Sequence, residues 1–224
     1  MIDAHVHVTA ELQPYLQGMR SIANADSPTE YRFLEGSGLP VISAGIHPWK
    51  ADVTSWEEME PILRAAPVIG EIGLDSVWCG VDMDVQRRVF RRQLALAAEL
   101  KKPVILHTKG MERDVLDTIR HYPNRYLVHW YSCEEYLQAY IDLDCWFTVG
   151  PDVRRDVAQQ VPIDRLLIES DGIDAIAWAK GREVSAEDYP KVVSVVLRET
   201  ADLRHMTAEA LLQQMEANLT AFLK

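Results

Sequence analysis

Short runs of apolar, often β-branched residues alternate along the chain with stretches whose apolar positions have helical spacing. Runs that are apolar on both faces and separated by helices are typical of a parallel sheet covered by helices. The pattern therefore predicts an α/β fold, a slightly trimmed (β/α)8 barrel of the TIM type with C-terminal helices. The eight predicted strands are Ile2 to Val8, Met19 to Ala23, Val41 to Ile46, Val68 to Leu74, Val104 to Leu106, Tyr126 to Val128, Cys145 to Val149 and Leu166 to Ile168.

Capping signals and amphipathic spacing predict helices between these strands. Ser27-Pro28-Thr29-Glu30 combines an N-cap serine with a proline and a glutamate in the first turn, so a helix begins there. From Val85 to Leu100, apolar residues recur at helical spacing opposite charged ones. Beyond Gly172 we expect a polar loop as far as Glu187, and then two amphipathic helices near Tyr189 to Thr200 and Thr207 to Leu223.

The length of the chain limits the size of this barrel. With 224 residues, of which 48% are hydrophobic, the chain can form one large core, and we predict a single domain over residues 1–224. A barrel of this type usually takes about 250 residues, so part of it must be trimmed. Only about ten residues separate the first two predicted strands. We therefore expect the first outer helix to be vestigial.

The charge and the cysteine content disfavour several classes of protein. The chain has 23 Lys and Arg against 34 Asp and Glu, a formal net charge of −11, which disfavours a broad surface for polyanions. It has neither a secretion signal at its start nor a run of about 18 apolar residues. The three cysteines fit neither a disulfide framework nor a metal knuckle. We expect a cytoplasmic protein with reduced thiols, no membrane contact and no obligate protein partner.

Titratable residues occur at the ends of five predicted strands. Because parallel barrel strands all end on the same rim, these residues are expected to converge there. A lone histidine at a strand end is usually structural, but a group of imidazoles and carboxylates buried without a cation would leave unpaired donors and charges. Four histidines and two acids suffice for two divalent ions with positions left for water. The six residues are His5, His7, Glu71, His107, His129 and Asp171.

Motifs around these residues recur in a characteristic order: IDAHVH, GIHP, GEIGLD, PVILHTK, HWYSC and LLIESD. In order and spacing the chain resembles the TatD-type metal-dependent hydrolases, often described as deoxyribonucleases, within the amidohydrolase-like barrels. The resemblance implies that one ion is held by His5, His7, Glu71 and Asp171. It implies that the second is held by Glu71, His107 and His129, so that Glu71 bridges the two.

The resemblance also implies roles in catalysis and substrate binding. Asp171 is the candidate general base for a water activated between the ions, and Glu71 is catalytic as the bridge. His47 lines the pocket without binding metal, and Lys109 occupies the position of the family's usual arginine. Imidazole-rich ligation favours zinc first, with manganese or magnesium as alternatives.

Aromatic residues near the same rim have two interpretations. Trp130 and Tyr131, together with Trp49, Trp78 and Trp178, either stack on nucleobases or simply pack the mouth of the barrel. Asp75, which closes GEIGLD, either orients a histidine ligand or caps a turn.

Three functions compete for this sequence. The leading prediction is a phosphodiesterase that acts on short DNA ends or a small nucleotide. The alternative is hydrolysis of an amide, ester or lactone, since related barrels direct the same activated water to carbonyl carbon. A third, a binding protein without catalysis, is disfavoured because all six predicted ligands are present.

Overall fold

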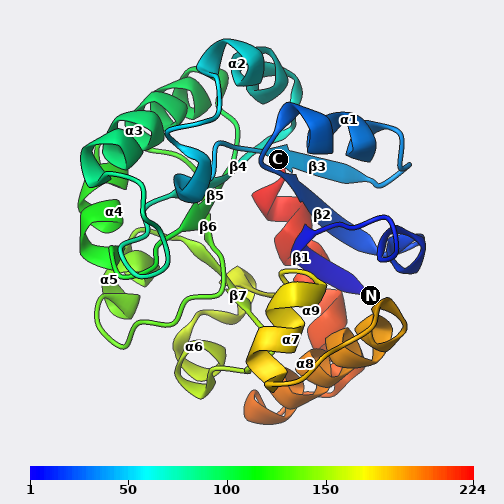
Figure 1. Cartoon of the computed structure of the whole chain (residues 1–224). Coiled ribbons are helices and arrows are strands. Elements are labelled where there is room, and N and C mark those ends of the chain that lie inside the picture. The colour runs from blue at the N-terminus through cyan, green and yellow to red at the C-terminus, as the bar shows by residue number, and fades with distance from the viewer.

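Eight strands form a ring, which Figure 1 shows end-on with helices around its outside. The computed structural model describes all residues from 1 to 224. Each strand pairs in parallel with the next along the chain. The strands are β1 (Ile2–His7), β2 (Arg20–Ala25), β3 (Val41–Ala44), β4 (Val68–Gly73), β5 (Val104–His107), β6 (Tyr126–Val128), β7 (Trp146–Val149) and β8 (Leu166–Ile168). The predicted barrel is confirmed, and no strand end differs from its prediction by more than two residues.

Helices follow the strands and cover the ring. Side chains of Ser27, Ser55 and Asp82 each accept a backbone N–H of the first turn, so helices begin after them. Between β1 and β2 there is only a 3-10 turn, Gln13–Leu16, as expected for a vestigial helix. The α-helices are α1 (Pro28–Glu35), α2 (Trp56–Ala65), α3 (Met83–Leu100), α4 (Glu112–Ile119), α5 (Leu137–Asp142), α6 (Arg155–Gln160), α7 (Ile173–Lys180), α8 (Tyr189–Leu203) and α9 (Ala208–Phe222).

The segment after Gly172 differs from its prediction. Instead of a polar loop running to Glu187, it begins with α7, whose sequence IDAIAWAK contains three alanines. Alanine has the highest helix propensity, which explains why the helix forms here. Gly181, with a φ of 62°, ends α7 in the left-handed region that favours glycine. The helix brings Trp178 to the mouth of the barrel.

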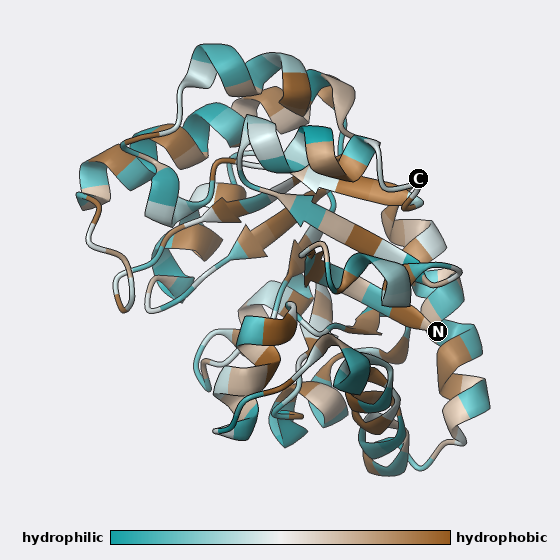
Figure 2. Cartoon of the chain, turned by 45° about the vertical axis from the view of Figure 1, so that its right-hand side comes forward, coloured by the Kyte–Doolittle hydropathy of each residue, from teal (hydrophilic) through white to brown (hydrophobic).

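Hydrophobic side chains fill the ring and the space between strands and helices. Figure 2 shows hydrophobic residues concentrated along the strands and hydrophilic residues on much of the outer helical surface. Ile22, Ile69 and Leu127, from three different strands, are fully buried. This core fixes the strand ends, and with them the side chains at the rim. None of the helices combines the length and apolar character needed to cross a membrane.

Strands β8 and β1 meet at a seam without a regular ladder. The backbone N–H of Asp171 donates to the carbonyl of His5 over 3.1 Å. The carboxylate of Asp3 accepts the backbone N–H of Ser170 at 3.0 Å through Oδ1 and the hydroxyl of Tyr189 at 2.7 Å through Oδ2. A few specific bonds therefore hold the seam, beside two predicted ligands.

Helix α9 lies against the amino-terminal ends of several strands. Arg20 at the start of β2 and Arg125 before β6 each donate to a carbonyl of α9 over 3.0 Å. In return, the amide of Asn218 donates to the carbonyl of Leu166 in β8 over 2.8 Å. In Figure 1 this red helix runs behind the ring, so it covers the end opposite the rim that carries the histidines.

Candidate metal centre

The six residues predicted to bind metal lie together at the carboxyl ends of the strands. Four of them are buried, whereas His7 and Asp171 are partly exposed. The residues come from β1 (His5 and His7), β4 (Glu71) and β5 (His107), and from the positions directly after β6 (His129) and shortly after β8 (Asp171).

Glu71 lies between two groups of imidazoles. Its Oε2 is 3.3 Å from Nε2 of His5 and 3.3 Å from Nε2 of His7. Its Oε1 is 2.6 Å from Nδ1 of His107 and 2.7 Å from Nε2 of His129. Each carboxylate oxygen thus faces a different histidine pair, an arrangement that allows one carboxylate to contact two cations.

We call His5, His7 and Asp171 the outer half of the centre. Oδ1 of Asp171 is 3.3 Å from Nε2 of His5 and 3.7 Å from Nε2 of His7. Together with Glu71, these residues offer ligand atoms within 4.8 Å of one another. The side chain of His7 is 38% exposed, so this half is open to solvent. Gly172 (φ 96°) passes so close that a Cβ there would lie 2.7 Å from the His7 carbonyl oxygen, which requires glycine.

We call His107 and His129 the inner half. Each imidazole lies between Glu71 and a second carboxylate. Nε2 of His107 is 3.1 Å from Oδ2 of Asp75, and Nδ1 of His129 is 3.4 Å from Oε1 of Glu169. A carboxylate behind a histidine orients the ring and raises its basicity toward a metal. Both rings of the inner half are therefore supported from behind.

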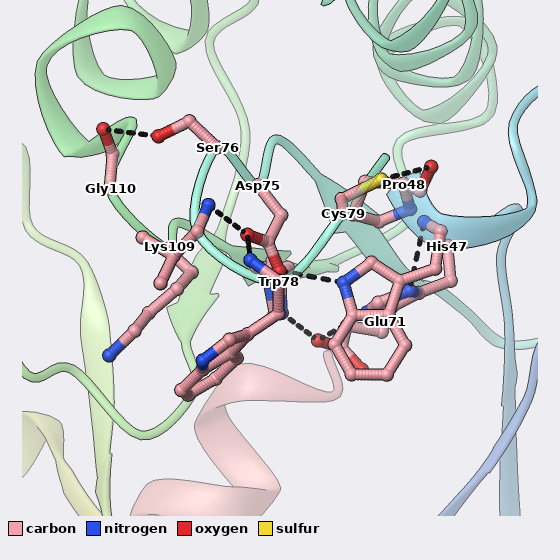
Figure 3. Close-up of polar contacts among 12 residues, drawn as sticks. His47, Pro48, Glu71, Asp75, Ser76, Trp78, Cys79, Lys109 and Gly110 are labelled. Atoms are coloured by element: carbon pink, nitrogen blue, oxygen red, sulfur yellow. Dashed lines mark hydrogen bonds and ion pairs between the residues drawn. The ribbon is translucent and has the colours of Figure 1, made fainter. Parts of the chain in front are cut away.

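Asp75 performs both roles that the sequence left open. Its Oδ1 accepts the backbone N–H groups of Val77 at 2.7 Å and Trp78 at 2.9 Å, which caps the turn after β4. Its Oδ2 accepts the indole N–H of Trp49 at 2.6 Å and contacts His107 (Figure 3). Burial opposes the ionisation of Asp75, but the bonds from His107, Trp78 and Trp49 lower its pKa below the usual value. The carboxylate is thereby fixed as an anion.

The electrostatics of the centre favour positive charge. Burial opposes the ionisation of Glu71, yet nearby His129, His47 and His107 hold its pKa well below the usual range. Burial also opposes the protonation of His129, but Glu71 and Glu169 raise the pKa of this imidazole well above its usual value. The buried carboxylates thus require cations nearby, and divalent ions can take that place without protonating the imidazoles.

Buried polar atoms without partners point to the same conclusion. Both ring nitrogens of His5 are buried without a hydrogen bond, although Oε2 of Glu71 and Oδ1 of Asp171 each lie 3.3 Å from Nε2. Leaving such groups unpaired in the interior costs free energy. A metal ion held by His5, Glu71 and Asp171 would satisfy Nε2 of His5. The donor set of imidazoles and carboxylates suits zinc and similar ions.

His47 lies in a second group of potential ligands, with Glu71 and His107. Its Nε2 is 3.3 Å from Oε1 of Glu71. The backbone N–H of Trp49 donates to its Nδ1 over 3.2 Å, so a neutral ring carries its hydrogen on Nε2. Burial lowers the pKa of His47 and so favours this neutral form. His47 then presents a donor rather than a free lone pair, which fits a substrate contact better than metal ligation.

Lys109 and Trp130 lie at the mouth of the barrel, as expected. The ammonium of Lys109 donates to the Ser132 hydroxyl over 3.1 Å and lies 4.4 Å from the ring centre of Trp78. Trp130 is partly exposed, and its indole N–H donates to Oδ1 of Asp152 over 2.8 Å. Both side chains can therefore reach a molecule bound at the rim.

Tyr131 does not reach the mouth. It is 1% exposed, and its hydroxyl donates to the backbone carbonyl of Glu135. Its ring packs edge-on against Tyr140 and Phe147. The prediction that Tyr131 binds substrate is therefore wrong, because the chain turns at Trp130 (φ 36°) and places the next side chain in the core.

The sequence prediction missed three residues that support the centre. Glu169 lies behind His129. Its position directly after an apolar strand is the sequence feature that could have identified it. Asp3 and Tyr189 join β1 to α8 at the seam, and burial raises the pKa of Asp3 to about 6 despite hydrogen bonds from Ser170 and Tyr189. Tyr189 had no signal, because its contact with Asp3 spans most of the chain.

Comparison with known proteins finds similar chains over most of this length. An uncharacterized metal-dependent hydrolase, YabD of Bacillus subtilis, is 26% identical over 241 residues, which cover 93% of each chain. The 3'-5' ssDNA/RNA exonuclease TatD of Pantoea ananatis is 28% identical over 196 residues, covering 79% of this chain and 75% of that protein.

A solved structure shares the fold. The crystal structure of YJJV, a TatD homologue from Escherichia coli, superposes with a TM-score of 0.82 at 23% identity, covering 100% of this chain and 97% of the other. The sequence profile described as TatD related DNase matches residues 2–224. The chain therefore belongs to the TatD related DNase family of metal-dependent hydrolases.

Proposed function

We propose that this protein is a two-metal phosphodiesterase that acts on short DNA or RNA ends or on small nucleotides. The observation that carries the proposal is the position of Glu71, whose two oxygens face different histidine pairs. Two cations joined by one carboxylate suit phosphoryl transfer, because they neutralise charge on both the attacking and the leaving oxygen. The exonuclease name of the Pantoea relative supports the same substrate class.

In this proposal each half of the centre holds one ion. When bound, the ions would supply Lewis acidity and lower the pKa of a bound water toward about 7. We propose zinc first, because imidazole nitrogens outnumber carboxylates, with manganese or magnesium as alternatives. A cytoplasmic location remains a prediction. The outer ion would be held by His5, His7, Glu71 and Asp171, and the inner ion by Glu71, His107 and His129.

The chain's own residues divide the chemical work. Only Oδ1 of Asp171 contacts the histidines, so its other oxygen is free to accept a proton from the attacking water. Glu71 holds both halves at a fixed separation. The Nε2 hydrogen of His47 points toward the centre, where it can donate to a phosphoryl oxygen. Lys109 adds a positive charge beside the same region, suited to a neighbouring phosphate.

The test is a substrate panel run on protein of known metal content. The panel contains labelled single-stranded oligonucleotides, duplexes, small phosphodiesters, esters, lactones and N-acyl amino acids, each with Zn²⁺, Mn²⁺ or Mg²⁺. We expect close to two ions per chain by elemental analysis, and turnover of single-stranded ends or small phosphodiesters in preference to long duplexes. Turnover of a carbonyl substrate with none of any phosphodiester would contradict the proposal and favour the amide, ester or lactone alternative.

A further inference from the structure

Three tryptophans form a continuous row at the mouth of the barrel. Trp78 lies in the loop after β4, Trp130 follows β6, and Trp178 lies on α7 after β8. The ring centroid of Trp178 is 5.6 Å from that of Trp78 and 5.9 Å from that of Trp130, both in edge-to-face contacts. Strands β4 and β8 lie opposite each other in an eight-stranded ring. The tryptophan row therefore connects opposite parts of the rim.

The row exposes an unusual amount of aromatic surface. Trp178 is 63% exposed and Trp78 is 50% exposed. Helix α7 is mostly apolar, yet Ile176 is its only buried residue. Contiguous exposed apolar surface beside an active site commonly marks a place where a ligand binds. Trp178, with the greatest exposure, is the member of the row best placed to take a planar ligand.

Two cations without acidic partners flank the row. Lys109 lies 4.4 Å from the ring centre of Trp78, and its other contact is the hydroxyl of Ser132. Lys180, two residues beyond Trp178, donates to the carbonyl of Pro151 over 2.8 Å. Neither lysine forms an ion pair, although acidic residues outnumber basic ones in the chain. Aromatic rings between free positive charges suit a ligand that combines planar groups with negative charge.

The side of the mouth at the start of α7 has the reverse character. A cleft of 760 Å³ lies between the loop after β1 and the segment around α7. Its lining includes Glu11, Asp174 and Glu187 and no lysine or arginine. An anionic chain leaving the metal centre is repelled from this cleft and attracted toward Lys109 and Lys180.

The tryptophan row is directly linked to the inner half of the centre. Trp130 follows His129 in the sequence. The backbone N–H of Trp78 donates to Asp75, the carboxylate that holds His107. Figure 3 shows Trp78 and Lys109 extending from this region toward the same side. A strand whose phosphodiester lies at the inner half thus has its neighbouring bases beside these indoles.

We propose that Trp78, Trp130 and Trp178 form a stacking platform for the unpaired bases next to the phosphodiester that is cleaved. Lys109 and Lys180 would contact the backbone phosphates between them. Base stacking on indoles tolerates any sequence, so the platform selects single strands rather than a particular base. This inference rests on the proposed phosphodiesterase function and specifies how that site recognises its substrate.

The test compares Trp178→Ala with Phe33→Ala, in the metal-loaded full chain. Phe33 is a matched control, because it is 40% exposed and lies on α1, outside the tryptophan row. On a single-stranded oligonucleotide we expect Trp178→Ala to raise KM roughly tenfold with little change in kcat, as loss of one stacked base predicts. Phe33→Ala should match the wild type. Equal KM values for the two variants would overturn the platform.

A second arm uses oligonucleotides with abasic residues next to the cleaved bond. The wild type should lose about as much affinity on the abasic substrate as Trp178→Ala loses on the normal one, and Trp178→Ala should lose little more. Lys180→Ala should reduce the salt dependence of binding by about one phosphate contact. An abasic substrate bound as well as the normal one would overturn base stacking.

Two further outcomes separate this inference from the proposed function. If the protein hydrolyses phosphodiesters but Trp178→Ala behaves as wild type, only the platform fails. If no phosphodiester is hydrolysed, the proposed function fails, and quenching of tryptophan fluorescence by the oligonucleotide, lost in Trp178→Ala, still supports the platform. A shift from dimer to monomer in Trp178→Ala, without quenching in the wild type, would assign the row to contact between copies instead and overturn the proposal.

Discussion

The two halves of the metal centre share Glu71 but are built differently. In the inner half, His107 and His129 come from adjacent strands β5 and β6, and Asp75 and Glu169 lie behind them. In the outer half, His5 and His7 lie on β1 and face Asp171 across the seam. No carboxylate lies behind either outer histidine except those of the centre itself.

This difference predicts unequal binding of the two ions. Carboxylates behind the inner histidines fix ring orientation before a metal arrives, so the inner ion should bind more tightly. The outer half depends on bonds across the β8–β1 seam, and His7 is partly exposed. The outer ion should therefore exchange faster with solvent. We therefore predict a centre with one tightly held and one exchangeable ion.

The largest expected effect comes from removing the shared residue. Glu71→Gln replaces the carboxylate that faces both halves, so both ions should bind weakly. We expect turnover to fall on the order of 10³-fold, a loss comparable to that of a preorganised charge-stabilising group. Elemental analysis and kcat measure the two effects. His7→Ala is the comparison, and it should lose only the outer ion. Near-normal turnover in Glu71→Gln would contradict the bridging role.

The next prediction separates the halves. Asp75→Asn removes the negative charge behind His107, so affinity for the inner ion should fall about 10- to 100-fold. Affinity for the outer ion should stay unchanged. Calorimetric titration of metal-free protein with Zn²⁺ measures both constants. Asp84→Asn, an exposed acid at the start of α3, is the control. If the affinities for both ions fell equally, the two halves would not be independent.

His47→Ala should affect substrate rather than metal. If His47 donates from Nε2 to a phosphoryl oxygen, its loss should raise the free energy of the transition state by about 1.5 kcal/mol. The value of kcat/KM should then fall roughly tenfold. Metal content should remain that of the wild type, because Nδ1 already accepts the N–H of Trp49. Loss of one ion in this variant would make His47 a ligand.

The smallest effect is expected at the seam. Tyr189→Phe removes the hydroxyl that donates to Asp3 and should reduce the free energy of unfolding by about 1 kcal/mol. Because Asp3 also binds the strand end that carries Asp171, outer-ion affinity should fall slightly while inner-ion affinity is unchanged. Tyr122→Phe is a control on a tyrosine away from the seam. If only the affinity for the inner ion fell, the outer half would not depend on the seam.

The sequence predicted most of this architecture because its signals are local. Each strand is a short apolar run, and the six convergent residues follow from one rule about where parallel strands end. Contacts behind the centre were harder to predict. Glu169 follows β8 and faces His129, which follows β6, although these two strands are not neighbours. Tyr189 contacts Asp3 from the other end of the sequence, so no short stretch of sequence contains both residues. Tyr131 was misplaced because one left-handed residue, Trp130, reverses the direction of the next side chain.

The position of α9 has a consequence for synthesis of the protein. Its residues bind the starts of β2 and β8 and the residue before β6, three points far apart along the chain. Chains emerge from the ribosome amino end first, at about 5–20 residues per second. The amino-terminal ends of these strands therefore stay uncovered until Asn218 and Phe222 have emerged, and we expect the histidine cluster to assemble stably only then. Metal loading should accordingly follow the emergence of α9 from the ribosome rather than precede it.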